Sequence, residues 1–140
     1  MSILVIDASV AIKWFLPEPH SINAIRLIDA GHELTAPDLI IPEFGNVLWK
    51  KWQRQELEPD VIPSLLNDLC RMNVSIVPTF SLICEASRIS VSWRRSFYDS
   101  IYLALAVASN GRMVTADEKL YNALKDTPMT ERLVMIGEMI

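Results

Sequence analysis

The sequence predicts a three-layer α/β/α sandwich built around a mostly parallel sheet. Short apolar segments rich in β-branched residues alternate with longer segments of helical pattern, as strands and helices do in such folds. Hydrophobic residues make up 51% of the 140 residues and there are only four glycines, so the chain can bury a substantial core. Residues 97–110 form a helix-like segment that is apolar on nearly every side, which belongs inside a protein. We expect residues 1–140 to form a single domain.

The predicted strands are short apolar runs bounded by polar residues or proline. Ile3 to Ile6 is apolar at every position, which is typical of a strand buried on both faces of a parallel sheet. The other strands are expected at residues 34–36, 74–77, 112–115 and 133–136, the last at an edge of the sheet.

The predicted helices of the first half have recognisable ends. Pro17 stops the first of them, Ser21 caps the second, and Gly31 ends it. Pro42 is tolerated only near the first turn of the third helix, where no amide donor is needed. The helices are expected at residues 10–15, 21–30, 37–55, 59–72, 80–90, 97–110 and 117–124.

The second half shows the same pattern of apolar faces and stop signals. The segment 92–96 is polar and should connect the fifth helix to the sixth, which Gly111 should end. The apolar run of the sixth helix is too short to cross a bilayer, which needs about 20 residues, so we expect no membrane association. The inward face of the fourth helix should carry Ile62, Leu65, Leu66 and Leu69.

Four acidic residues fall where ligands bind in parallel α/β sheets, beyond the carboxyl ends of the strands. Asp7 follows the first strand, and Asp117 follows the 112–115 strand by two residues. Glu43 and Asp99 each lie in the first turn of a helix, and the helix of Asp99 is otherwise apolar. The four carboxylates can therefore converge on one edge of the sheet.

Each acid taken alone also has an ordinary explanation. Asp7 and Asp117 suit helix N-caps, and Glu43 suits the positive end of its helix. Together, however, two carboxylates about 5 Å apart repel by roughly 3 kcal/mol at an effective dielectric constant near 20. A divalent cation removes that cost, and an all-oxygen site favours Mg²⁺ or Mn²⁺ over zinc.

Three polar residues beside these acids are candidates to support them. Ser9 and Thr115 can hydrogen-bond a carboxylate or a metal-bound water, or simply close a local turn. Asn46 lies one turn beyond Glu43 and can orient that carboxylate, contact a substrate, or stay a surface amide.

The basic residues form two modest clusters in a chain whose formal charge is −4. This overall charge argues against a general nucleic-acid coat, but it allows a local rim that grips phosphates; a solvated face is the alternative. Trp49, Trp52 and Trp93 lie near these clusters and can stack on bases or pack in the protein. The basic candidates are Lys50, Lys51, Arg94 and Arg95.

Other chemistries find little support. His20 and His32 lie in loop-like places without a partner at ligand spacing, and no glycine-rich phosphate loop is present. Cys70 and Cys84 are expected to be buried free thiols, which suits a reducing cytoplasm. The first residues lack the basic region and long apolar stretch of a signal sequence. We therefore expect a cytoplasmic protein.

The four acidic segments resemble, in order, the motifs of PIN-domain ribonucleases of the VapC toxin type. The match covers almost the whole chain, and the four motifs together are specific. The similar segments are Ile3–Ser9, Pro42–Leu48, Tyr98–Ala106 and Val114–Leu120.

This resemblance implies an endoribonuclease that uses Mg²⁺ or Mn²⁺, with Asp7, Glu43, Asp99 and Asp117 around the metal. It also implies a homodimer and a cognate antitoxin that covers the acidic groove. Glu118 adjoins Asp117 and could serve the metal instead, although the family pattern favours Asp117. Two alternatives stay open: a non-catalytic α/β protein that binds a metal or a partner, and a PIN nuclease of housekeeping RNA processing.

Overall fold

The computed structural model describes residues 2–139 and contains one five-stranded sheet in the order β3-β2-β1-β4-β5. All four strand pairings are parallel, and β1 lies at the centre of the sheet. This arrangement confirms the predicted fold class. The strands are β1 (Ile3–Ile6), β2 (Glu33–Pro37), β3 (Ser75–Val77), β4 (Arg112–Thr115) and β5 (Leu133–Met135).

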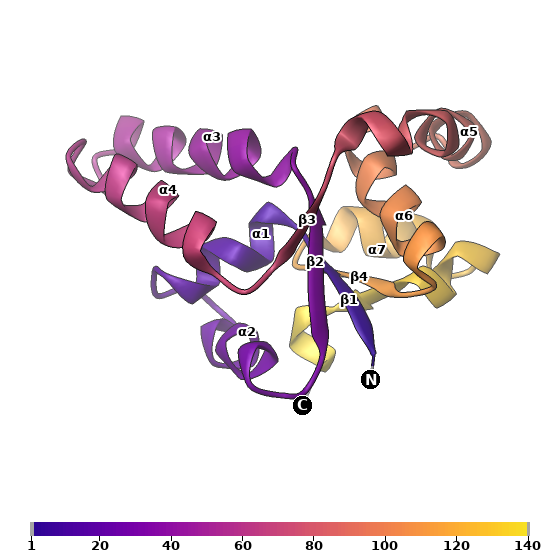
Figure 1. The fold of residues 1–140 in the computed structure, drawn as a ribbon, viewed down its shortest axis with the longest axis horizontal. Helices are drawn as coiled ribbons and strands as arrows, with labels where there is room; N and C mark the ends of the chain where they lie inside the picture. The colour runs from indigo at the N-terminus through magenta and orange to yellow at the C-terminus, as the bar shows by residue number, and fades with distance from the viewer. Residues whose placement is uncertain (1, 140) are drawn as a thin grey trace.

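Helices cover both faces of the sheet, with α1 to α4 on one side and α5 and α6 on the other (Figure 1). The helices are α1 (Ala8–Ala11), α2 (Ser21–Ile28), α3 (Ile40–Gln53), α4 (Val61–Arg71), α5 (Ile83–Trp93), α6 (Phe97–Ser109) and α7 (Glu118–Leu124). Residues 2–139 also contain four 3₁₀ turns: η1 (Ile12–Trp14), η2 (Thr79–Leu82), η3 (Pro128–Arg132) and η4 (Ile136–Glu138). No helix in this part of the chain is both long and apolar enough to span a membrane.

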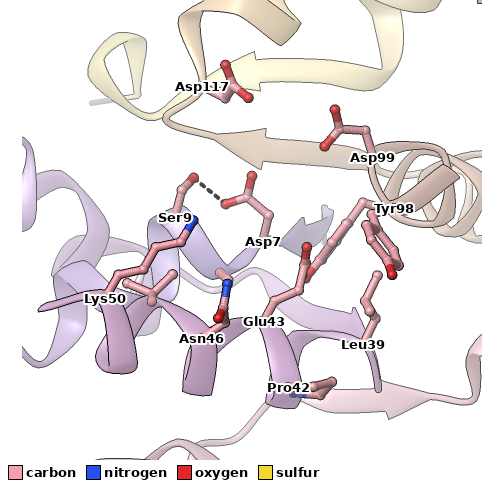
Figure 2. A pocket seen from close by; sticks show the side chains of 13 residues that line it. Asp7, Ser9, Leu39, Pro42, Glu43, Asn46, Lys50, Tyr98, Asp99 and Asp117 are labelled. Carbon is pink, nitrogen blue, oxygen red and sulfur yellow. Dashed lines mark hydrogen bonds between the residues drawn. The ribbon is translucent and has the colours of Figure 1, made fainter. Parts of the chain in front are cut away.

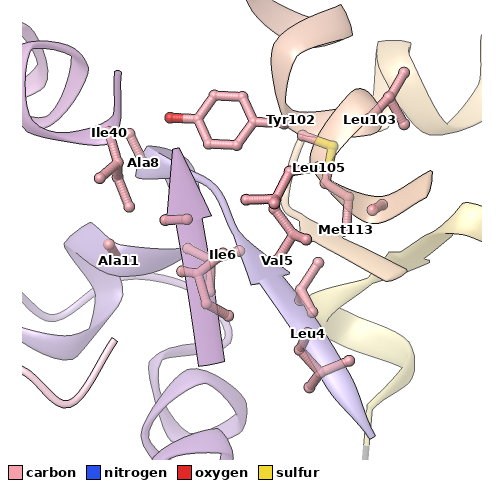
Figure 3. Packing of buried hydrophobic residues seen from close by; sticks show 14 of the residues in the cluster. Leu4, Val5, Ile6, Ala8, Ala11, Ile40, Tyr102, Leu103, Leu105 and Met113 are labelled. Carbon is pink, nitrogen blue, oxygen red and sulfur yellow. The ribbon is translucent and has the colours of Figure 1, made fainter. Parts of the chain in front are cut away.

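The core is organised around β1 and α6. Every position from Leu4 to Ile6 is fully buried, as expected for a strand covered on both faces. α6 packs on β1, β2 and β4, and its residues 100 to 106 are all buried. Leu105 projects from α6 toward Val5 of β1, while Ala11 and Ile40 pack on the opposite side of the sheet (Figure 3). The apolar helix predicted from the sequence is therefore a central element.

Most predicted helix boundaries differ from the structure by one to three residues, and Gly31 lies beyond the end of α2 at Ile28. Three differences have a clear structural reason. α1 begins at Ala8, two residues early, because the Asp7 side chain accepts a hydrogen bond from Val10 N–H and caps it. Ser21 is the first residue of α2 and not its cap; its hydroxyl accepts from Glu18 N–H and donates to the Leu16 carbonyl. The fifth helix starts as the turn η2 and continues to Trp93, so the predicted connection over residues 92–96 is shorter than expected.

Gly111 was expected to end α6, and that prediction is wrong in its detail. The left-handed residue is Asn110, at φ 55°, and Gly111 N–H closes the helix end by donating to the Ala106 carbonyl at 2.9 Å. Gly111 is required for another reason. A Cβ atom at this position would lie 2.5 Å from the carbonyl oxygen of Ile3, on the central strand.

The cysteine prediction is also wrong. Cys70 and Cys84 are both free, as expected, but both are exposed. Cys70 lies on the solvent side of α4, whose buried positions are Leu65 and Leu69, and Cys84 lies in the first turn of α5. Helical spacing in short apolar stretches did not reveal which face was covered.

Two glycine substitutions should have opposite effects on stability. Gly111→Ala should lower the free energy of unfolding by about 1–3 kcal/mol, because its Cβ would meet strand backbone that cannot move aside. Gly45→Ala should raise the free energy of unfolding by about 0.5–1 kcal/mol, because Gly45 lies inside α3 and its Cβ would meet only Leu66 Cδ2, at 3.7 Å. Urea unfolding monitored by circular dichroism measures both; equal stability of the two variants would contradict the role of Gly111.

Candidate active site

A cavity of about 590 Å³ opens at the carboxyl ends of the central strands, and all four predicted acids line it (Figure 2). Asp99 and Asp117 face it from the α6 and β4 side, and Glu43 faces it from α3, with Asp7 between them (Figure 2). Four segments distant in the sequence therefore contribute one carboxylate each. The remaining polar residues of the wall are Ser9, Asn46, Lys50, Tyr98 and Tyr102.

Asp7 is the most deeply buried of the acids, with 8% of its surface exposed. One carboxylate oxygen accepts from the Ser9 hydroxyl at 2.6 Å and from Val10 N–H at 3.0 Å, and the other accepts from the Thr115 hydroxyl at 2.7 Å. Burial nevertheless raises the pKa of Asp7 to about 6, and the nearby charge of Glu43 adds to the increase. A charge at this place is costly unless a further positive group compensates it.

Ser9 and Thr115 join the loop after β1 to the loop after β4. The Thr115 hydroxyl accepts from Asp117 N–H at 3.1 Å while it donates to Asp7, and the Ser9 hydroxyl accepts from Ala116 N–H at 3.2 Å. Thr115 is fully buried and does not line the cavity. Both hydroxyls therefore contact the Asp7 carboxylate and set its position relative to Asp117; a role around a metal stays a prediction.

Glu43 is held by a residue that the sequence reasoning did not select. The Tyr102 hydroxyl donates to Glu43 Oε1 at 2.6 Å, and the Tyr102 ring reaches from α6 across the end of the sheet (Figure 3). Burial raises the pKa of Tyr102 far above its usual value, so its hydroxyl stays protonated and donates. Burial also raises the pKa of Glu43, and Asp99 contributes. The signal in the sequence was the position of Tyr102 one helical turn after Asp99.

Asp99 and Asp117 form the more open side of the cavity. Asp99 is half-buried, and burial followed by the charge of Asp117 raises its pKa, although Arg95 opposes this. Asp117 is exposed and caps α7 by accepting from the N–H groups of Lys119 and Leu120. The cap explanation for Asp7 and Asp117 is thus correct, and it does not exclude their place in the cavity. Glu118 is exposed and does not line it.

Of the predicted basic residues, only Lys50 lines this cavity, together with Asn46 one turn before it. Both lie on the face of α3 that also carries Glu43, and the Lys50 side chain extends toward Ser9 (Figure 2). Lys51 instead forms an ion pair with Glu18 at 2.8 Å. Arg94 ends α5 in a left-handed conformation, and the Nε of Arg95 donates to the Trp93 carbonyl; neither lines the cavity.

The side chains of the cavity suit a hard divalent cation, since the acidic donors are all oxygen atoms. Within residues 2–139, no three His, Cys, Asp or Glu side chains are grouped closely enough to hold an ion by direct contacts alone. Mg²⁺ keeps several water ligands and takes one or two protein carboxylates directly. The arrangement therefore fits a cation held partly through water.

Comparison with known proteins agrees with this geometry. A model of the PIN domain matches residues 4–125. Ribonuclease VapC3 of Pyrobaculum aerophilum is 30% identical over 119 residues, which span 84% of this chain and 91% of that protein. The family match thus includes all four cavity acids.

Solved structures share the fold at lower identity. The PAE2754 protein of Pyrobaculum aerophilum has a TM-score of 0.72 at 20% identity, over 97% of this chain and 85% of that one. A chain in the structure of VapBC2 from Rickettsia felis bound to a promoter DNA fragment has a TM-score of 0.68 at 13% identity, over 95% and 98%. A chain of a toxin–antitoxin complex from Klebsiella pneumoniae has a TM-score of 0.63 at 14% identity, over 95% and 97%. The chain belongs to the PIN-domain family and is of its VapC type.

Proposed function

We propose that this protein is a metal-dependent endoribonuclease that hydrolyses RNA phosphodiester bonds with Mg²⁺ or Mn²⁺, as the toxin of a toxin–antitoxin pair. The observation that carries the proposal is the convergence of four carboxylates from four segments on one cavity. The relative named Ribonuclease VapC3 supports the activity, and the fold shared with VapBC2 and a toxin–antitoxin complex supports an antitoxin partner. We also propose that the protein is cytoplasmic and forms a homodimer.

We propose a separate role for each of the four acids. Asp7 and Asp99 would be the main ligands, and Glu43 a ligand or the base that orients the water. Asp117 would be a ligand through water or for a second ion. A bound cation would activate a water molecule and stabilise the charge that develops on the phosphate. Tyr102 keeps one oxygen of Glu43 engaged, which leaves the other free to face the cavity. Lys50 and Asn46 line the same cavity, and in this proposal they would contact the phosphate that enters beside the carboxylates.

Replacement of Asp99 by Asn should abolish cleavage without loss of folding. We expect at least about a hundredfold decrease in the rate of cleavage of single-stranded RNA with Mn²⁺, because a charged ligand becomes neutral. The melting temperature should stay the same or rise, since burial already raises the pKa of Asp99. Asp29→Asn, at an exposed site after α2, is the control and should cleave normally. Wild-type cleavage by Asp99→Asn would refute the assignment.

The stability of the metal-free protein should increase as the pH falls, through Asp7. The pKa of Asp7 is about 6 in the folded protein, against 3.8 for an ordinary aspartate as in the unfolded chain, so the folded protein binds the proton more tightly. Between pH 7.5 and pH 5 this contributes about 1.4 kcal/mol to the free energy of unfolding, the value of one pKa unit. Asp7→Asn should lack this contribution. Chemical unfolding of both proteins at the two pH values with a chelator measures the difference, and identical pH dependence in both would contradict it.

The same reasoning predicts a pH-dependent effect of the cation. Mn²⁺ should raise the melting temperature of the wild-type protein at pH 7.5 and much less at pH 5, where protons compete for the buried carboxylates. Asp7→Asn should show little increase at either pH. An equal increase for the variant and the wild type would place the bound ion elsewhere.

Tyr102→Phe should shift the pH dependence of cleavage as well as lower the rate of cleavage. Loss of the hydroxyl removes the hydrogen bond that holds down the pKa of Glu43, so this pKa should rise further. The acidic limb of kcat/KM against pH should therefore shift to higher pH, and the rate at neutral pH should fall about tenfold. Tyr121→Phe, on α7 and outside the cavity, is the matched control. An unchanged profile would show that Tyr102 only packs in the core.

A further inference from the structure

A second cavity, of about 250 Å³, adjoins the acidic one. Ser9, Val47 and Lys50 line both, so the two cavities share a wall. The second cavity has the opposite charge: its wall carries four basic side chains and one acidic side chain, an excess of three positive charges in a chain of net charge −4. The charged residues of this basic cavity are Lys13, Lys50, Lys51, Arg54 and Glu18.

Two of these lysines converge on a single carboxylate. Lys13 Nζ lies 3.2 Å from Glu18 Oε1, and Lys51 Nζ lies 2.8 Å from Glu18 Oε2. Lys13 is 7% exposed, which is unusual for a lysine and would be costly without an anionic partner. Burial opposes ionisation of Glu18, but the hydrogen bonds from Lys51 and Lys13 outweigh it and lower the pKa of Glu18. The Glu18 carboxylate thus lies between two ammonium groups and binds one with each oxygen.

Lys50 connects this place to the carboxylates. It follows Glu43 by two helical turns on the same face of α3, and it lines both cavities. Ser9 and Val47 also line both cavities, so a polyanion with one phosphate in the acidic cavity would have the basic cavity beside it. A repeating phosphate backbone matches this pair of adjacent sites, because each phosphate that is neutralised by Lys or Arg adds to affinity.

We propose that the basic cavity binds the RNA backbone phosphate adjacent to the scissile one, and that Glu18 occupies its lysine pair in the free protein and competes with that phosphate. This inference rests on the proposed function, since it assumes RNA as the substrate. It predicts opposite effects for the two partners of one ion pair: loss of Lys51 weakens RNA binding, and loss of the Glu18 charge strengthens it.

The test measures binding of a fluorescein-labelled single-stranded RNA by anisotropy, in Mg²⁺ buffer, with Asp99→Asn as the background so that the RNA stays intact. Lys51→Gln should weaken binding about five- to tenfold and reduce the slope of log K against log salt by about one. Glu18→Gln should strengthen binding several-fold. The matched controls come from the exposed ion pair of α5, Arg88 and Glu85, whose atoms lie 2.6 Å apart. Arg88→Gln and Glu85→Gln make the same charge changes and should leave affinity within twofold.

The outcomes separate this inference from the proposed function. Weaker RNA binding by both Lys51→Gln and Glu18→Gln would overturn this inference, because loss of either partner of a purely structural ion pair disrupts the same part of the protein. A lower melting temperature of both variants would identify that structural role. Control variants that change affinity as much as the cavity variants would also overturn it. If wild-type protein cuts RNA but all four variants bind alike, this inference fails alone. If wild-type protein does not cut RNA and the opposite effects persist, the phosphate site stands and the proposed function fails.

Discussion

Asp7 carries a carboxylate that is almost entirely withdrawn from water, at the end of the central strand, and the organisation of the site depends on how that group is accommodated. Its oxygens accept hydrogen bonds from Ser9, Val10 and Thr115. The bond from Val10 N–H caps the start of α1, and the bond from Thr115 connects Asp7 to the end of β4. Even so, burial keeps its pKa near 6. The protein therefore holds a charged group where it is only partly compensated, which is the condition under which a cation binds with most benefit.

The apolar helix α6 makes this arrangement rigid. Its buried residues lie against three strands, and two of the polar side chains it directs to the cavity, Asp99 and Tyr102, are one turn apart. Tyr102 crosses the end of the sheet to reach Glu43, so α6 positions a carboxylate on the opposite layer as well as its own. A catalytic constellation built on packed elements keeps its geometry better than one built on loops.

The charges of the molecule are distributed unevenly around this point. The four carboxylates of the acidic cavity lie beside a basic cavity in which Lys13 and Lys51 share Glu18. A net negative protein can in this way still present a positive surface to a phosphate backbone, because binding responds to the local field and not to the total charge. The side chain of Lys50, which borders both cavities, marks the boundary between the two fields.

The sequence alone was enough to predict the fold class, the five strands and the four acids that line one cavity. Strand and helix periodicity, and the position of an acid just after a strand, depend only on neighbouring residues. What periodicity does not report is which face of a helix another element covers, so Cys70 and Cys84 were misplaced. Nor does it report close backbone approach, which is the reason for Gly111, at a distance of 108 residues from Ile3. The partners of Glu43 and Lys51 likewise came only from the tertiary structure: Tyr102 and Glu18 are 59 and 33 positions away, and pairing over such separations is set by how the layers pack.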